Sequence, residues 1–131
     1  MKNDAHRNKE LAEQLLDWNR RNLRHDVELS QSLIAERFAP EFQVFANGRS
    51  YAADHESYQG FLQGFKSSIA SIDYEVTQIV ADEAGVVLAM RARVERVNAV
   101  RDQFEAMLLL RFDEQGKLVL WHEVYVQSQA V

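Results

Sequence analysis

The spacing of polar and apolar positions changes once along this chain. Up to residue 70, apolar side chains recur at steps of three and four residues in three stretches, the spacing of amphipathic helices. After Ser71 they alternate with polar residues, the period of a half-buried strand. The pattern predicts an α+β domain, with helices and one short strand first and a strand-rich half after them.

Three helices are predicted in the first half, over residues 4–23, 27–38 and 55–70. Asp26 and Asp54 are the expected N-caps of the second and third, because a carboxylate accepts hydrogen bonds from the free N–H groups of a first turn. Pro40 ends the second helix, since the residue before a proline is pushed out of the helical region. The third contains Gly60 and Gly64, each costing about 1 kcal/mol in a helix; close packing on a sheet would offset that cost.

Five strands are expected, over residues 41–45, 72–82, 86–98, 102–113 and 117–126. The last four follow one another with short connections and therefore predict an antiparallel meander. Residues 49–53, after the Asn47-Gly48 turn, are expected to form a loop. The 131 residues are expected to form one domain (1–131), with the helices packed on one side of a curved antiparallel sheet.

The strand at 117–126 carries the most informative side chains. With a period of two, Trp121, Glu123 and Tyr125 share one face, and His122 lies on the other. One face must therefore look into surroundings that tolerate a carboxylate between two aromatic rings. We interpret these surroundings as a pocket.

Composition narrows the classes of function. The chain has no cysteine, which removes disulfides, thiolate zinc sites and cysteine nucleophiles. Its four histidines lack ligand spacing, so no metal site and no cofactor is expected. A net charge of −5 argues against a nucleic-acid surface. No apolar run approaches the ~18–20 residues of a membrane span, and the polar first ten residues do not form a signal peptide; a cytoplasmic location is expected.

Two segments carry a family resemblance: residues 38–42 (Phe-Ala-Pro-Glu-Phe), which run into a strand, and residues 111–118 (Arg-Phe-Asp-Glu-Gln-Gly-Lys-Leu). With the order of elements, they resemble the nuclear transport factor 2-like superfamily, which includes ketosteroid isomerase and SnoaL-like polyketide cyclases. The resemblance covers nearly the whole chain. It implies a cystatin-like cone, with a deep pocket between the three helices and the concave sheet face. It also implies a homodimer through the convex sheet face, which His122 would then face.

The resemblance allows a test of chemistry. Ketosteroid isomerase uses a carboxylate base, a tyrosine and a protonated aspartate, and these positions fall on Ala46, Trp18 and Leu108. An indole N–H donates a hydrogen bond but is no acid or base at neutral pH, and leucine does neither. Ketosteroid isomerase activity is therefore not expected, and whether the chain is an enzyme stays open. In SnoaL-like cyclases an acid late in the chain acts as acid/base, and Glu123 is the candidate here.

The family pattern also assigns faces to three strands. It places on the concave face Arg91, Arg93, Phe104, Leu108, Trp121, Glu123 and Tyr125. Trp18 joins this expected ligand-binding set if it reaches the pocket floor, and is otherwise a core residue. It places on the convex face Met90, Ala92, Val94, Met107, Leu109 and His122. A buried charge needs a partner, so an Arg91–Glu123 or Arg93–Glu123 ion pair is expected, which would lower the pKa of Glu123.

Three functions stay open. The first is a small-molecule-binding protein with a semi-polar conical pocket and a partly apolar ligand, anionic if the arginines hold it. The second is a SnoaL-like isomerase, cyclase or hydratase that uses Glu123 as acid/base. The third is a non-catalytic dimerisation module in which the pocket is vestigial.

Overall fold

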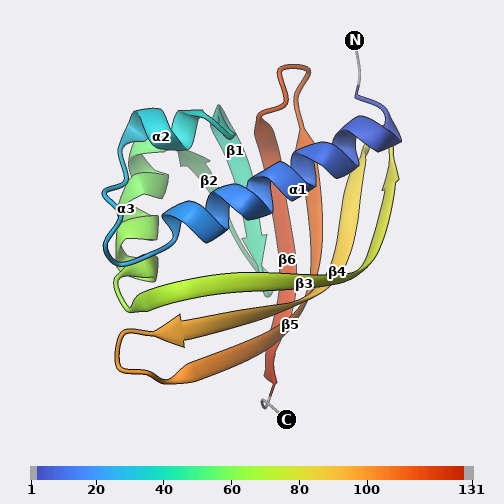
Figure 1. Cartoon of the computed structure of the whole chain (residues 1–131). Coiled ribbons are helices and arrows are strands. Elements are labelled where there is room, and N and C mark those ends of the chain that lie inside the picture. Colours follow the sequence, from blue (N-terminus) through green and yellow to red (C-terminus); the bar gives the residue numbers. More distant parts are fainter. Residues whose placement is uncertain (1–2, 129–131) are drawn as a thin grey trace.

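The computed structural model describes residues 3–128, which form three helices and six strands (Figure 1). In chain order these are α1 (Ala5–Asn22), α2 (Gln31–Ala35), β1 (Phe38–Ala46), β2 (Arg49–Asp54), α3 (His55–Lys66), β3 (Ile69–Asp82), β4 (Gly85–Arg96), β5 (Arg101–Phe112) and β6 (Leu118–Ser128). The α+β class is confirmed. None of these helices is long and apolar enough to cross a membrane.

The strands form one mixed sheet in the order β2-β1-β6-β5-β4-β3. β3 to β6 are the expected antiparallel meander, but β1 lies parallel to β6, so the expectation of an antiparallel sheet throughout is wrong. The parallel pair is sterically allowed because long connections separate β1 from β6 in the chain. Figure 1 shows the sheet curving around α1, which crosses its concave face, with α2 and α3 at one end.

The helix starts show which carboxylates act as caps. Asp54 caps α3 as expected, accepting from the Ser57 N–H at 2.8 Å in a reciprocal capping box. Asp26 caps no helix and instead lies 3.6 Å from Arg24. The five-residue α2 begins after Ser30, whose hydroxyl accepts from the Leu33 N–H at 3.1 Å. The second helix is shorter than predicted because the chain already enters β1 at Phe38.

Two further expectations in the first half are wrong. Residues 49–53 belong to strand β2, because Asn47 and Gly48, with φ of 50° and 87°, turn the chain back tightly on β1. Gly60 and Gly64 do not pack closely on the sheet, since a Cβ added at either would meet nothing within 4 Å. The structure offers no account of these two glycines.

The core lies between α1 and the concave face of the sheet. Leu15 and Leu16 on the inner side of α1 are at most 2% exposed. They belong to the same buried cluster as Leu88, Leu108 and Leu110 of β4 and β5. Burial of such side chains stabilises the fold by about 1.5–3 kcal/mol each, and it fixes which sheet face looks inward.

Candidate functional site

Strand β4 lies with its apolar residues on the concave face. Met90 pairs with Ala106, which pairs in turn with Tyr125, so the three share that face. Met90 and Val94 are both 4% exposed. The expectation that Met90, Ala92 and Val94 lie on the convex face is therefore wrong. The physical reason is that the inward face of a strand under a helix must be its apolar face.

Arg91 and Arg93 consequently lie on the convex face, and the expectation that they line the concave face beside Glu123 is wrong. Arg91 Nη1 is 3.3 Å from Glu75 Oε1, and Arg91 Nε is 3.7 Å from Glu105 Oε1. Arg93 Nη2 is 3.3 Å from Glu75 Oε2. No ion pair joins either arginine to Glu123 within residues 3–128.

The strand pairing places Glu123 at the centre of the concave face. Its direct neighbours are Ala46 on β1 and Leu108 on β5, which correspond to two of the isomerase positions. The Glu123 carboxyl group thus lies on β6, between the strands that carry these two positions. Glu123 is half-buried, as are Trp121 and Phe104, and Tyr125 is 38% exposed. These side chains form what we call the Glu123 face: Phe104, Trp121, Glu123 and Tyr125.

The environment of Glu123 favours its neutral form. Burial raises the pKa of Glu123 to about 7, and a hydrogen bond from the Trp121 side chain opposes this rise. The expected arginine partner would have moved the pKa the other way. A carboxyl group with this pKa exchanges a proton readily near neutral pH, so it can both donate and accept one.

Two tyrosines that were not predicted as site residues face the same region. Tyr58 on α3 is 7% exposed, and Tyr74 on β3 is half-buried. Burial raises the pKa of both phenols, and the Glu123 carboxylate raises each further. In the sequence both are simply apolar positions of a helix and a strand. Only the fold brings them to Glu123.

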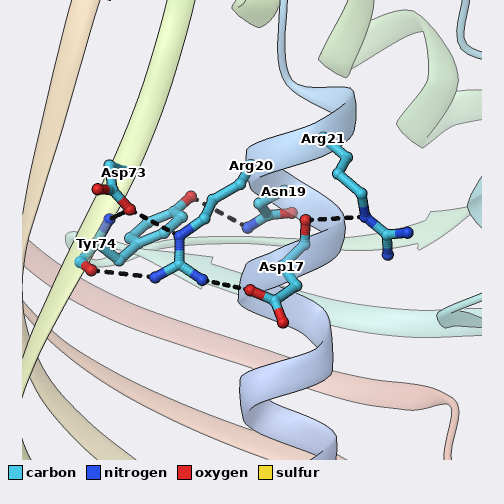
Figure 2. A network of polar contacts seen from close by, with 6 residues as sticks. All are labelled: Asp17, Asn19, Arg20, Arg21, Asp73 and Tyr74. Atoms are coloured by element: carbon cyan, nitrogen blue, oxygen red, sulfur yellow. Dashed lines mark hydrogen bonds and ion pairs between the residues drawn. The ribbon is translucent and has the colours of Figure 1, made fainter.

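Helix α1 holds Tyr74 in place (Figure 2). The Asn19 amide donates to the Tyr74 hydroxyl at 3.2 Å. Arg20 donates to the Tyr74 carbonyl at 3.1 Å, and its guanidinium lies 5.5 Å from the ring centroid. Arg20 also donates to Asp17 at 2.6 Å and to Asp73 at 2.7 Å. The Arg20 guanidinium is thus paired with two carboxylates, and it holds Tyr74 in position beside the site.

Trp18 on α1 and Leu108 on β5, beside Glu123, are buried core residues and offer no surface to solvent. They are 1% and 0% exposed. The Trp18 ring packs edge-on against Phe38, with centroids 5.4 Å apart. Its indole N–H has no hydrogen-bond partner in the described structure. Both residues support the Glu123 face from within the core.

Two surface hollows are found among residues 3–128. Glu123 lines neither of them, although the first reaches Tyr125 at the edge of the Glu123 face. One, of about 360 Å³, is lined by Thr77, Ala89, Met90, Arg91, Glu105, Ala106, Met107, Val124, Tyr125 and Val126. The other, of about 330 Å³, lies beside the β5–β6 turn. Neither of these is the deep cone pocket implied by the resemblance. Helix α1 packs against β3, β4 and β5, and its side chains fill the space above that part of the sheet. Within residues 3–128, no three His, Asp or Glu side chains are grouped to hold a metal ion.

No protein-family model and no curated protein matches this sequence. Solved structures do match it. An LEH-like epoxide hydrolase from M. tuberculosis superposes with a TM-score of 0.71 at 14% identity, over 93% of this chain and 84% of the other. A protein assigned as a SnoaL-like polyketide cyclase, from Shewanella putrefaciens CN-32, gives 0.72 at 14% identity, over 90% and 88%.

A third similar structure is an NTF2-like protein of unknown function from Burkholderia pseudomallei K96243. It gives a TM-score of 0.66 at 16% identity, over 89% of this chain and 88% of the other. All three likenesses extend along nearly the whole length of both chains, with low sequence identity. The chain therefore has the nuclear transport factor 2-like fold that these proteins share.

Proposed function

We propose that the chain binds a small, partly apolar molecule on the Glu123 face, with the Glu123 carboxyl as its polar contact. One observation carries this proposal: on the concave face, a half-buried carboxyl group lies among aromatic side chains and has no cationic partner in the part of the chain that the structure describes. Such a group costs folding free energy unless a ligand or a reaction uses it. The sequence suggested an anionic ligand held by Arg91 and Arg93. Because these two arginines lie on the convex face, they cannot hold a ligand beside Glu123.

A second candidate is acid/base catalysis by Glu123 in an isomerase, cyclase or hydratase reaction. The observation that favours it is the pKa of about 7, since a catalytic acid or base works best near the ambient pH. Two similar structures are named as an epoxide hydrolase and as a SnoaL-like cyclase. The Tyr58 and Tyr74 hydroxyls would then orient the substrate.

A screen by NMR tests the binding proposal. Isotope-labelled protein is mixed with small neutral, anionic and cationic compounds, and amide shifts are followed. We expect at least one compound to move the signals of Trp121, Glu123 and Tyr125, while Met107 on the convex face stays unchanged. If no compound moves these signals, the binding proposal is wrong. That result would favour the alternative of a non-catalytic dimerisation module with a vestigial pocket.

We also propose that the convex face joins two copies of the chain in a homodimer. Its exposed apolar side chains support this: Val80, Met107, Val124 and Val126 are 67%, 55%, 56% and 60% exposed. An apolar patch of this kind favours association. Sedimentation should show a dimer that Met107→Glu dissociates, while Phe61→Glu, at a 50% exposed position on α3, leaves it intact. A wild-type monomer contradicts this proposal.

A further inference from the structure

The lack of a positively charged partner for the Glu123 carboxylate indicates that its ligand carries a positive charge. Across the sheet its neighbours are the uncharged Ala46 and Leu108. The charged and titratable groups on its side of the sheet include Arg49, which pairs with Ala46, and two phenols that are neutral at ordinary pH, Tyr58 from α3 and Tyr74 from β3. Burial and the Trp121 hydrogen bond account for its titration, without any cation. Within residues 3–128, the structure therefore gives this carboxylate no positive partner.

Aromatic rings occupy the positions around this carboxylate. Trp121 and Tyr125 flank Glu123 on its own strand. Phe104 packs edge-on against Tyr125, with centroids 5.8 Å apart at 81°. Tyr58 and Tyr74 approach from the other elements. The faces of such rings attract cations, and a carboxylate among rings is the arrangement that recognises organic ammonium groups.

Arg49 shares the concave face with Glu123, because it pairs with Ala46, the β1 neighbour of Glu123, but no ion pair joins the two among the described residues. Arg20 and Arg96 are already engaged by carboxylates. Arg20, against Tyr74, contacts Asp17 and Asp73. Arg96, at the end of β4, lies 2.9 Å from Asp102. Neither can move to Glu123 without leaving a carboxylate unpaired, and Arg49 makes no ion pair with it, so the Glu123 carboxylate has no positive partner within residues 3–128.

We propose that the ligand of the Glu123 face is an organic cation, an amine or quaternary ammonium with an apolar body, whose positive charge pairs with the Glu123 carboxylate while its alkyl groups contact the Trp121 and Tyr125 rings. This inference rests on the proposed function and specifies the ligand class of the same site. Exposure of Tyr125 and partial exposure of Trp121 give the cation a route from solvent.

The pairing has a pH signature. Only the ionised carboxylate attracts the cation, so affinity rises with pH through about 7 and then stays level. Tyr58 and Tyr74 remain protonated over this range, because the pKa of each is raised. Between one pH unit above and one below the pKa of Glu123, the ionised fraction changes roughly tenfold, and affinity should follow.

Calorimetry and amide shifts with choline test the proposal. The matched probe is the uncharged analogue in which a tert-butyl group replaces the trimethylammonium, so shape is kept and charge is lost. We expect wild-type protein to bind choline roughly tenfold more tightly than the analogue above pH 7. Glu123→Gln should abolish this preference, and Glu105→Gln on the convex face should keep it. Tyr125→Leu, at the exposed rim, should weaken choline binding without altering the pH dependence.

The outcomes separate this inference from the proposal on which it rests. Equal binding of choline and its analogue, unchanged in Glu123→Gln, overturns the cationic ligand. So does a neutral or anionic compound that moves the amides of the Glu123 face when choline does not; in that case the binding proposal itself stands. If every compound leaves the Trp121, Glu123 and Tyr125 signals in place, the binding site itself is contradicted.

Discussion

On the convex face of the sheet, Arg91 and Arg93 each lie 3.3 Å from Glu75, with all three side chains 44–56% exposed. On the concave face, Glu123 is half-buried without a cationic partner in residues 3–128. The first arrangement is nearly neutral in free energy, because exposed ion pairs contribute about 0–1 kcal/mol. The second costs free energy in the ionised state. Ionised side chains on the convex face therefore cost the fold little, whereas an ionised carboxylate on the concave face destabilises it.

The largest expected difference between the two faces concerns adjacent residues of β5. Leu108 is 0% exposed and Met107 is 55% exposed. Leu108→Ala should lower the free energy of unfolding by about 2–5 kcal/mol, because it removes core contacts and leaves a cavity. Met107→Ala should change the monomer by no more than about 0.5 kcal/mol. Urea unfolding at low protein concentration measures both, and similar losses would contradict the assigned faces.

The next effect concerns Glu123 and pH. Its pKa rises from 4.5 in the unfolded chain to about 7 in the fold. Between these values the folded state binds more protons, so stability falls as pH rises from 4.5 to 7 and levels off above. The ionised carboxylate then costs roughly 3 kcal/mol. Glu123→Gln should recover most of this above pH 7 and change little below 4.5, measured by urea unfolding at several pH values.

Glu105→Gln is the control for this experiment, since Glu105 is exposed beside Arg91. Its unfolding should show the wild-type pH dependence. A Glu123→Gln variant that is destabilised at every pH would mean that the carboxylate has a partner, and the contrast between the faces would fail.

The smallest effect is expected at the outer ion pairs. Glu75→Gln removes the carboxylate shared by Arg91 and Arg93 and should destabilise the protein by about 0–1 kcal/mol, less at high salt because ions screen exposed charges. Thermal unfolding at low and high ionic strength measures this. A loss that persists at high salt would show that these pairs are shielded from water, as in a dimer interface.

Much of the fold could be predicted from the sequence, because helix and strand periods are local signals. The α1 boundaries, the Asp54 cap and the meander followed from them, as did the shared face of Trp121, Glu123 and Tyr125. Which residues of β4 face the concave side was predicted wrongly. The more apolar alternating set of this strand already indicated the answer in the sequence: Val86, Leu88, Met90 and Val94. The family pattern and the hydrophobicity of this strand indicate opposite faces, and the hydrophobicity agrees with the structure. In β3, a bulge between Val76 and Gln78 interrupts alternation, which no local signal marks.

The candidate site was less predictable than the fold. Glu123 could be singled out, because a carboxylate between rings on a strand is an unusual local pattern. Its pKa could not, since it depends on which residues from distant segments surround it. Tyr58 and Tyr74 reach Glu123 from α3 and β3, and their role follows from the tertiary arrangement alone.

The position of β6 in the sheet has a consequence for how the protein is made. Strand β6 is the last of the described strands, yet it lies between β1 and β5, and in the described sheet the β1–β2 hairpin joins the other strands only through β6. During synthesis, β1 and β2 therefore pair only with each other until residues 118–128 of β6 have left the ribosome. Such distant pairing slows folding. Folding should be completed only after release of β6, and chaperones that shield strand edges would act on this chain before then.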